Sequence, residues 1–102
     1  MPGKTYFIVR LSFTDPSKVW ETVPKHSRWM REYHKAGKIV AGGPLSDMSG
    51  AVGILCVDSA DEAEKIMENE PFVSGGIATM ILAQWDPILH GCIGDKAQTK
   101  GA

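Results

Sequence analysis

Residues 51–57 have the sequence Ala-Val-Gly-Ile-Leu-Cys-Val, a run that contains no charged side chain. Its length and its aliphatic content, with glycine-containing and polar segments on both sides, predict a β-strand. Because successive side chains of a strand point to opposite faces, the even-numbered side chains share one face and the odd-numbered ones share the other. Both faces of this strand are therefore apolar, and both need a cover.

The apolar second face has a consequence for the assembly. In a two-layer α/β domain, helices cover only one face of the sheet, so another partner must cover the other face. A second copy of the same chain is the simplest partner. The chain has 102 residues, which allows one modest core but no internal chamber that could enclose a substrate. We therefore expect a homodimer whose active site lies in a cleft or at an interface.

The first predicted strand covers residues 5–13, with the sequence TYFIVRLSF. Its odd-numbered side chains from Phe7 to Phe13 are aromatic or aliphatic and predict the core face. Its even-numbered side chains include Arg10 among apolar and hydroxyl groups. Such a mixed face is typical of a strand that borders a site or a second subunit.

Two helices are predicted between the strands. Asp15 and Pro16 give a start signal for the first, Pro24 marks a kink or the start of a longer segment, and Gly37 ends it. Ser59 and Glu62 fit a capping box that opens the second helix. Trp20, Trp29, Phe7 and Phe13 are predicted to lie in the core.

Further strands at residues 38–42 and 77–86 give the order β-α-β-β-α-β. This order predicts an α+β fold of the ferredoxin-like type, with a four-stranded antiparallel sheet and both helices on one face. Two such sheets packed through their open faces would form a dimeric α+β barrel. We expect one domain over residues 1–90 and a loose C-terminal tail over residues 91–102.

Composition excludes several classes of function. The formal net charge of −1 and the pI near 6.3 argue against nucleic-acid binding, which favours a clustered basic face. No apolar run approaches the ~20 residues of a membrane span, and no leader is evident, so we expect a cytoplasmic protein with no membrane partner. Cys56 and Cys92 make neither a disulfide framework nor a zinc site. We predict no metal and no cofactor.

Several short motifs together resemble the YciI-like (YCII-related) family of dimeric α+β-barrel proteins. They are HSRWM at residues 26–30, GKIVAGGPL at 37–45, SADEA at 59–63 and Pro71-Phe72. The resemblance extends back through the first strand. The family usually has Asp-Pro where this chain has Glu70-Pro71.

The resemblance implies a His-Asp pair in a cleft, and these residues map onto His26 and Asp47. His26 lies on the apolar stripe of the first helix with Trp29, Met30 and Tyr33, at helical spacing. A neutral imidazole can take and return a proton near neutral pH, and a carboxylate can fix its tautomer. The alternative for His26 is a core histidine with satisfied hydrogen bonds, and for Asp47 a plain role in its turn.

The family includes a dehydrochlorinase that acts on a chlorinated hydroxyhydroquinone in the degradation of aromatics. The resemblance therefore implies a cofactor-free acid/base lyase with a small aromatic substrate. Arg10 would stabilise the oxyanion or form a salt bridge across the dimer, and Tyr6, Ser12 and Trp85 would line the same cleft. A muconolactone-type isomerase, a monooxygenase and a non-catalytic dimeric binding or accessory protein stay open as alternatives.

Overall fold

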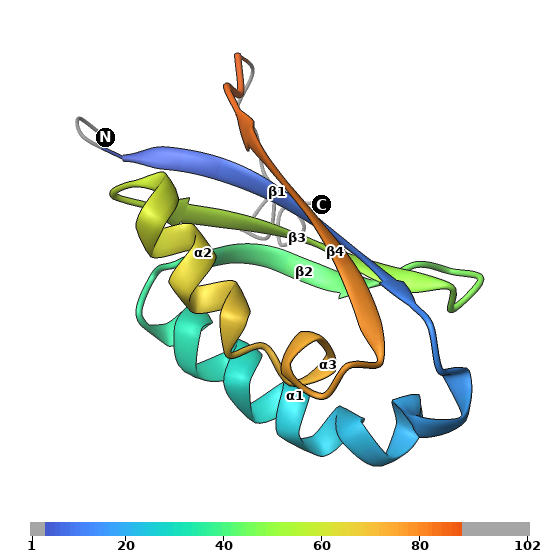
Figure 1. Ribbon diagram of the computed structural model, residues 1–102. Helices are drawn as coiled ribbons and strands as arrows, with labels where there is room; N and C mark the ends of the chain where they lie inside the picture. Colours follow the sequence, from blue (N-terminus) through green and yellow to red (C-terminus); the bar gives the residue numbers. More distant parts are fainter. Residues whose placement is uncertain (1–3, 89–102) are drawn as a thin grey trace, which may run out of the picture.

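The computed structural model describes residues 4–88, so the predicted tail lies outside the described residues. Three α-helices and a 3-10 helix pack on one side of a four-stranded sheet (Figure 1). In chain order the elements are β1 (Thr5–Phe13), η1 (Pro16–Lys18), α1 (Val19–Lys35), β2 (Ile39–Pro44), β3 (Gly50–Val57), α2 (Ala60–Glu68), α3 (Pro71–Ser74) and β4 (Ala78–Trp85).

The sheet has the strand order β2-β3-β1-β4, and every neighbouring pair is antiparallel. This is the predicted α+β, ferredoxin-like arrangement, in which the two central strands are the first and the third. The four predicted strands are confirmed, and α3 is one short helix in the segment between α2 and β4. None of the helices within residues 4–88 has the length and apolar character needed to cross a membrane.

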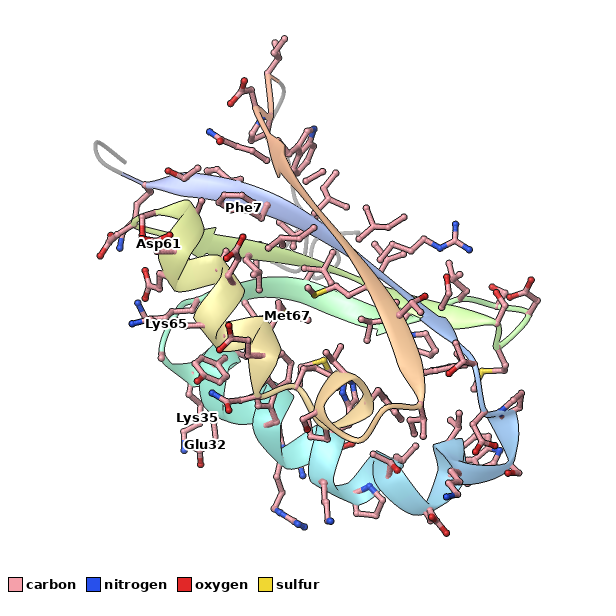
Figure 2. All side chains as sticks on the ribbon, in the orientation of Figure 1. Phe7, Glu32, Lys35, Asp61, Lys65 and Met67 are labelled. Carbon is pink, nitrogen blue, oxygen red and sulfur yellow. The ribbon has the colours of Figure 1, made fainter. Side chains whose placement is uncertain are left out.

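The core lies between the sheet and the helices. Phe7, Val9 and Leu11 are buried on the helix side of β1, as the alternation predicts. Met67 points from α2 toward the sheet, whereas Asp61 and Lys65 on the same helix point outward (Figure 2). No helix within residues 4–88 lies over the opposite face of the sheet.

Helix α1 begins three residues after Pro16 of its predicted start signal. The Asp15-Pro16 signal opens the 3-10 helix, and α1 follows directly and continues through Pro24. The prediction that Trp20 lies in the core is wrong: its side chain is 70% exposed, and its neighbour Val19 is buried instead. Gly37 follows the helix at φ +80°, a left-handed conformation that glycine adopts without steric cost.

The start of α2 is held by the predicted cap. Ser59 accepts a hydrogen bond from the backbone N–H of Glu62, and the Glu62 carboxylate accepts one from the backbone N–H of Asp58 and pairs with Lys38. The Asp58 backbone hydrogen bond and then Lys38 lower the pKa of Glu62 below its ordinary value. The ionised carboxylate therefore stabilises the fold.

We expect Glu62→Gln to lower the free energy of unfolding by about 1 kcal/mol at pH 7. Folding lowers the pKa of Glu62. The difference in free energy of unfolding between the wild type and the variant is therefore complete above the ordinary glutamate pKa, and it is lost as the pH falls through the pKa of Glu62 in the folded protein. Urea unfolding at pH 7 and at pH 3 measures it. Asp61→Asn, which removes a charge from the same first turn, is the matched control. If Glu62→Gln were less stable than the wild type by the same amount at both pH values, the stabilisation would not come from the charge of Glu62.

Candidate active site

His26 lies where α1 faces α3. Its imidazole ring lies 4.6 Å from the ring of Phe72 and 5.9 Å from that of Trp29, measured between ring centroids, and it is near-parallel to Trp29 at 25°. The side chain is 16% exposed, so its position is fixed by packing while part of it stays accessible. The predicted helical stripe thus puts His26 at the boundary between core and solvent.

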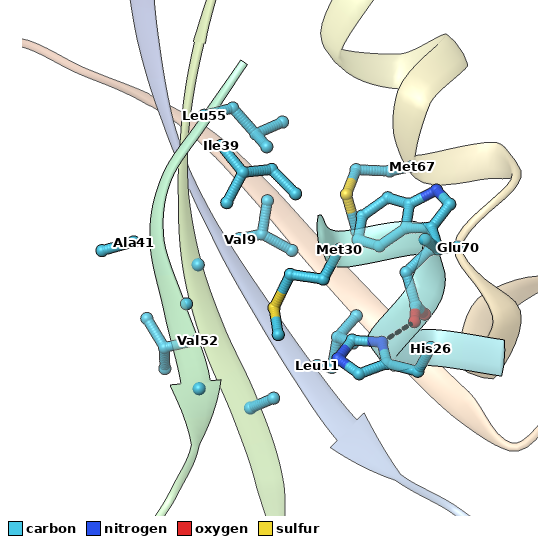
Figure 3. Close-up of a pocket in the computed structure, with 15 residues that line it drawn as sticks. Val9, Leu11, His26, Met30, Ile39, Ala41, Val52, Leu55, Met67 and Glu70 are labelled. Atoms are coloured by element: carbon cyan, nitrogen blue, oxygen red, sulfur yellow. Dashed lines mark hydrogen bonds and ion pairs between the residues drawn. The ribbon is translucent and has the colours of Figure 1, made fainter. Parts of the chain in front are cut away.

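The partner of His26 is Glu70, the residue that caps α3. Its side chain is fully buried, and Oε1 accepts a hydrogen bond of 3.0 Å from the backbone N–H of Val73. Its Oε2 lies 2.5 Å from Nδ1 of His26 (Figure 3). We place the hydrogen on Nδ1, because an ionised carboxylate can only accept. This tautomer leaves the lone pair of Nε2 available to a ligand.

The pair lies at one end of a small pocket between α1 and the sheet. Val9, Leu55 and Ile39 form part of the sheet side, and Met30 reaches in from α1 (Figure 3). Among the described residues that line the pocket, His26 and Glu70 are the only ionisable side chains. The cavity measures about 40 Å³, against about 150 Å³ for an apolar cavity that binds benzene. A ring can therefore enter only if a side chain moves.

Trp29 gives the site a further polar group. Its Nε1 is buried and has no hydrogen-bond partner within residues 4–88. Most buried polar groups in proteins are paired. The indole N–H is thus a donor beside His26 that the described part of the chain does not use.

Asp47 is not the partner of His26. It lies in the loop between β2 and β3, where its Oδ1 accepts hydrogen bonds from the backbone N–H and the hydroxyl of Ser49. These hydrogen bonds hold the pKa of Asp47 below its ordinary value. The expected His26–Asp47 pair is corrected to His26–Glu70, and Asp47 forms the local turn contact that its Ser-Asp sequence also allows.

The four residues predicted to bind substrate lie on the other face of the sheet. Arg10 is paired in register with Val52 and Ile81, and the even-numbered residues of β1 point away from the helices. Tyr6 pairs with Trp85 on the same face, and Ser12 pairs with Thr79. Within one chain these side chains do not share a cleft with His26. The alternation assigned both faces correctly, but the cleft lies on the helix side.

Tyr6 has its own partner on that face. A hydrogen bond with Cys56 of β3 raises the pKa of the Tyr6 phenol. Within residues 4–88 no group of three or more histidine, cysteine, aspartate or glutamate side chains could hold a metal ion. His90 and Cys92 lie outside the described residues.

The sequence does contain one signal for Glu70. An acidic residue directly before Pro71 is typical of a helix N-cap followed by proline at the first helical position. A carboxylate in that place is held by the backbone and cannot turn freely.

Comparison with known proteins places the chain among small α+β proteins. The model of the YCII-related domain matches residues 7–86. A similar solved structure is that of 5-chloro-2-hydroxyhydroquinone dehydrochlorinase from Burkholderia phenoliruptrix in complex with 2,5-dihydroxybenzoquinone. The two chains share 22% identity and a TM-score of 0.60, over 78% of this chain and 93% of the other. At this identity the likeness shows the fold. No curated protein matches the sequence.

Proposed function

Because this chain belongs to the YCII-related domain family, we propose that it is a small enzyme that eliminates chloride from a chlorinated hydroxyhydroquinone by acid/base catalysis. The observation that carries the proposal is the part-buried His26–Glu70 pair at the end of an apolar pocket. Support for the substrate comes from the structurally similar dehydrochlorinase. The chemistry needs one base that can take and return a proton.

The geometry of the pair suits a general base. Glu70 holds Nδ1 of His26 from the protein side, so Nε2 is free to accept a proton from a substrate hydroxyl. The imidazolium that then forms lies 2.5 Å from a buried carboxylate, which stabilises it. Phe72 and Trp29 hold the ring in place, so little reorganisation is needed during the transfer.

The proposed reaction loses HCl without an external oxidant or reductant. His26 takes the proton of one ring hydroxyl and returns it to the ring carbon that carries chlorine, which gives a keto tautomer. A second hydroxyl then gives its proton to His26, which is neutral again and later releases that proton to solvent. The electron pair of this hydroxyl oxygen forms a second C=O bond, the ring double bond shifts toward the carbon that carries chlorine, and chloride leaves with the C–Cl pair. The ring rises to the quinone level as C–Cl becomes C–H.

The experiment is a chloride-release assay under anaerobic conditions, with chlorohydroxyhydroquinone and no added cofactor. We expect one equivalent each of chloride and hydroxybenzoquinone, and turnover that does not need oxygen. Turnover only in the presence of oxygen would indicate a monooxygenase. Isomerisation of muconolactone without chloride release would favour the isomerase. Tight binding without turnover would favour an accessory protein.

We also propose that the protein works as a homodimer through the open sheet face. Ile81 of β4 is 65% exposed on this face. Arg10 of β1 lies between Ile81 and Val52 of β3. An apolar surface of this kind is typical of an interface. Two copies would bury it and close the barrel.

We expect Ile81→Lys to weaken dimerisation by about 100-fold or more, because its ammonium group would be buried beside the like charge of Arg10. Sedimentation equilibrium of the wild type and the variant measures the change. Glu68→Lys introduces the same side chain at an exposed position of α2 and serves as the control. A dimer of unchanged affinity in the Ile81 variant would place the interface elsewhere.

A further inference from the structure

The pocket exists because two facing positions of the sheet have no side chain. Gly42 of β2 and Gly53 of β3 are paired in register, and Gly53 is also paired with Val9, which is buried on the helix side. Both glycines therefore face α1, and both line the pocket with His26. The sheet surface beneath His26 is bare backbone at this point.

Packing does not require glycine at position 53. A Cβ built there would lie 3.6 Å from the carbonyl oxygen of Ala41, an ordinary contact, with no other atom within 4 Å. Glycine inside a central strand costs stability relative to alanine. The chain thus gives up stability where alanine would fit, and the space it keeps lies next to a candidate base.

We propose that Gly42 and Gly53 form the floor on which a flat ring of the substrate lies, with its hydroxyl toward Nε2 of His26. This rests on the proposed function only in taking a hydroxylated ring as the ligand. Met30 occupies part of the same space, since its Sδ would be 3.4 Å from a Cβ at Gly42. A methionine side chain is flexible and packs well against aromatic rings, so it can move aside and cover the ligand.

The ionisable groups that line the pocket favour a ligand that is uncharged and can donate a proton. No lysine or arginine is among the described residues that line it, and its one acidic side chain is Glu70. A ligand that arrives as an anion meets like charge in a poorly hydrated site. A phenol that arrives neutral can lose its proton to His26 without a change in total charge. The site thus selects hydroxylated rings without a carboxylate.

Binding of 4-chlorophenol, measured by calorimetry at pH 7, tests the proposal without any need for turnover. We expect 4-chlorobenzoate, a ring of similar size that is anionic, to bind at least about tenfold more weakly. We expect Gly53→Ala to weaken 4-chlorophenol binding by about tenfold or more, because one methyl group then occupies the ring site. Its unfolding temperature should equal or exceed that of the wild type.

Asp61→Glu is the control. It adds one methylene group at an exposed position of α2 that does not line the pocket. We expect unchanged binding. In the wild-type protein, titration with 4-chlorophenol should also shift the amide signal of Gly53. Unchanged affinity in Gly53→Ala, or no shift at Gly53, would overturn the proposal. Absence of chloride release with this binding pattern intact would overturn only the proposed reaction.

Discussion

His26→Gln is expected to lower the rate of chloride release by about 10²- to 10⁴-fold, the usual contribution of a general base. A glutamine amide can still donate a hydrogen bond to the Glu70 carboxylate, which keeps the buried charge partnered. It cannot accept and return a proton at neutral pH. The variant therefore separates the base function of His26 from its structural role. Anaerobic chloride release, with thermal unfolding in parallel, measures both.

His26→Ala gives a second measure of the same function. It loses the base and also leaves the fully buried Glu70 carboxylate without its partner, so we expect a lower unfolding temperature as well. Added imidazole is expected to occupy the space and restore part of the turnover. His34→Ala, at an exposed position of the same helix, is the control and should change neither quantity. Wild-type turnover in His26→Gln would exclude His26 as the base.

The fold could be predicted because its signals are local. Strand alternation in residues 5–13 and 51–57, the Ser59 cap and the glycine after the first helix each depend on near neighbours in the chain. The helical stripe also placed His26 against the core. The prediction for Trp20 was wrong because Val19, not Trp20, is the residue at this end of α1 that faces the core, and the next side chain along a helix points in another direction.

The partner of His26 could not be predicted in the same way. Glu70 lies 44 positions away, and the contact depends on how α3 packs against α1. Asp47 fitted the expected residue type, but its loop lies beyond the end of β2, and its carboxylate is held by Ser49. Alternation sorted Arg10 to the correct face of β1. It could not indicate which of the two faces borders the pocket, since that depends on the packing of the helices.

Glu70→Gln is expected to reduce turnover by about 10²- to 10⁴-fold while the protein stays folded. The amide oxygen can still accept from the Val73 N–H, which preserves the cap of α3. The amide nitrogen then faces Nδ1 of His26 as a donor, so the imidazole must carry its hydrogen on Nε2. The imidazole lone pair, now on Nδ1, is then directed at the introduced amide, and Nε2 has none to accept the substrate proton. Nitrogen NMR of the imidazole reports the tautomer directly, and a purely structural role for Glu70 would not change it.

Glu70→Ala and Glu70→Asp complete the series. Alanine removes the cap and the partner of His26 together, and we expect a loss of about 2–4 kcal/mol in the free energy of unfolding, or roughly 10–20 °C in Tm. Aspartate keeps the charge on a shorter side chain, so Nδ1 stays protonated, and we expect turnover well above that of Glu70→Gln. Comparing the turnover of the two variants separates the effect of charge from that of packing, because the glutamine variant keeps the size of the side chain and the aspartate variant keeps its charge. If Glu70→Gln matched the wild type in rate, or kept the hydrogen on Nδ1, Glu70 would act only in folding, and the base at His26 would need another source of orientation.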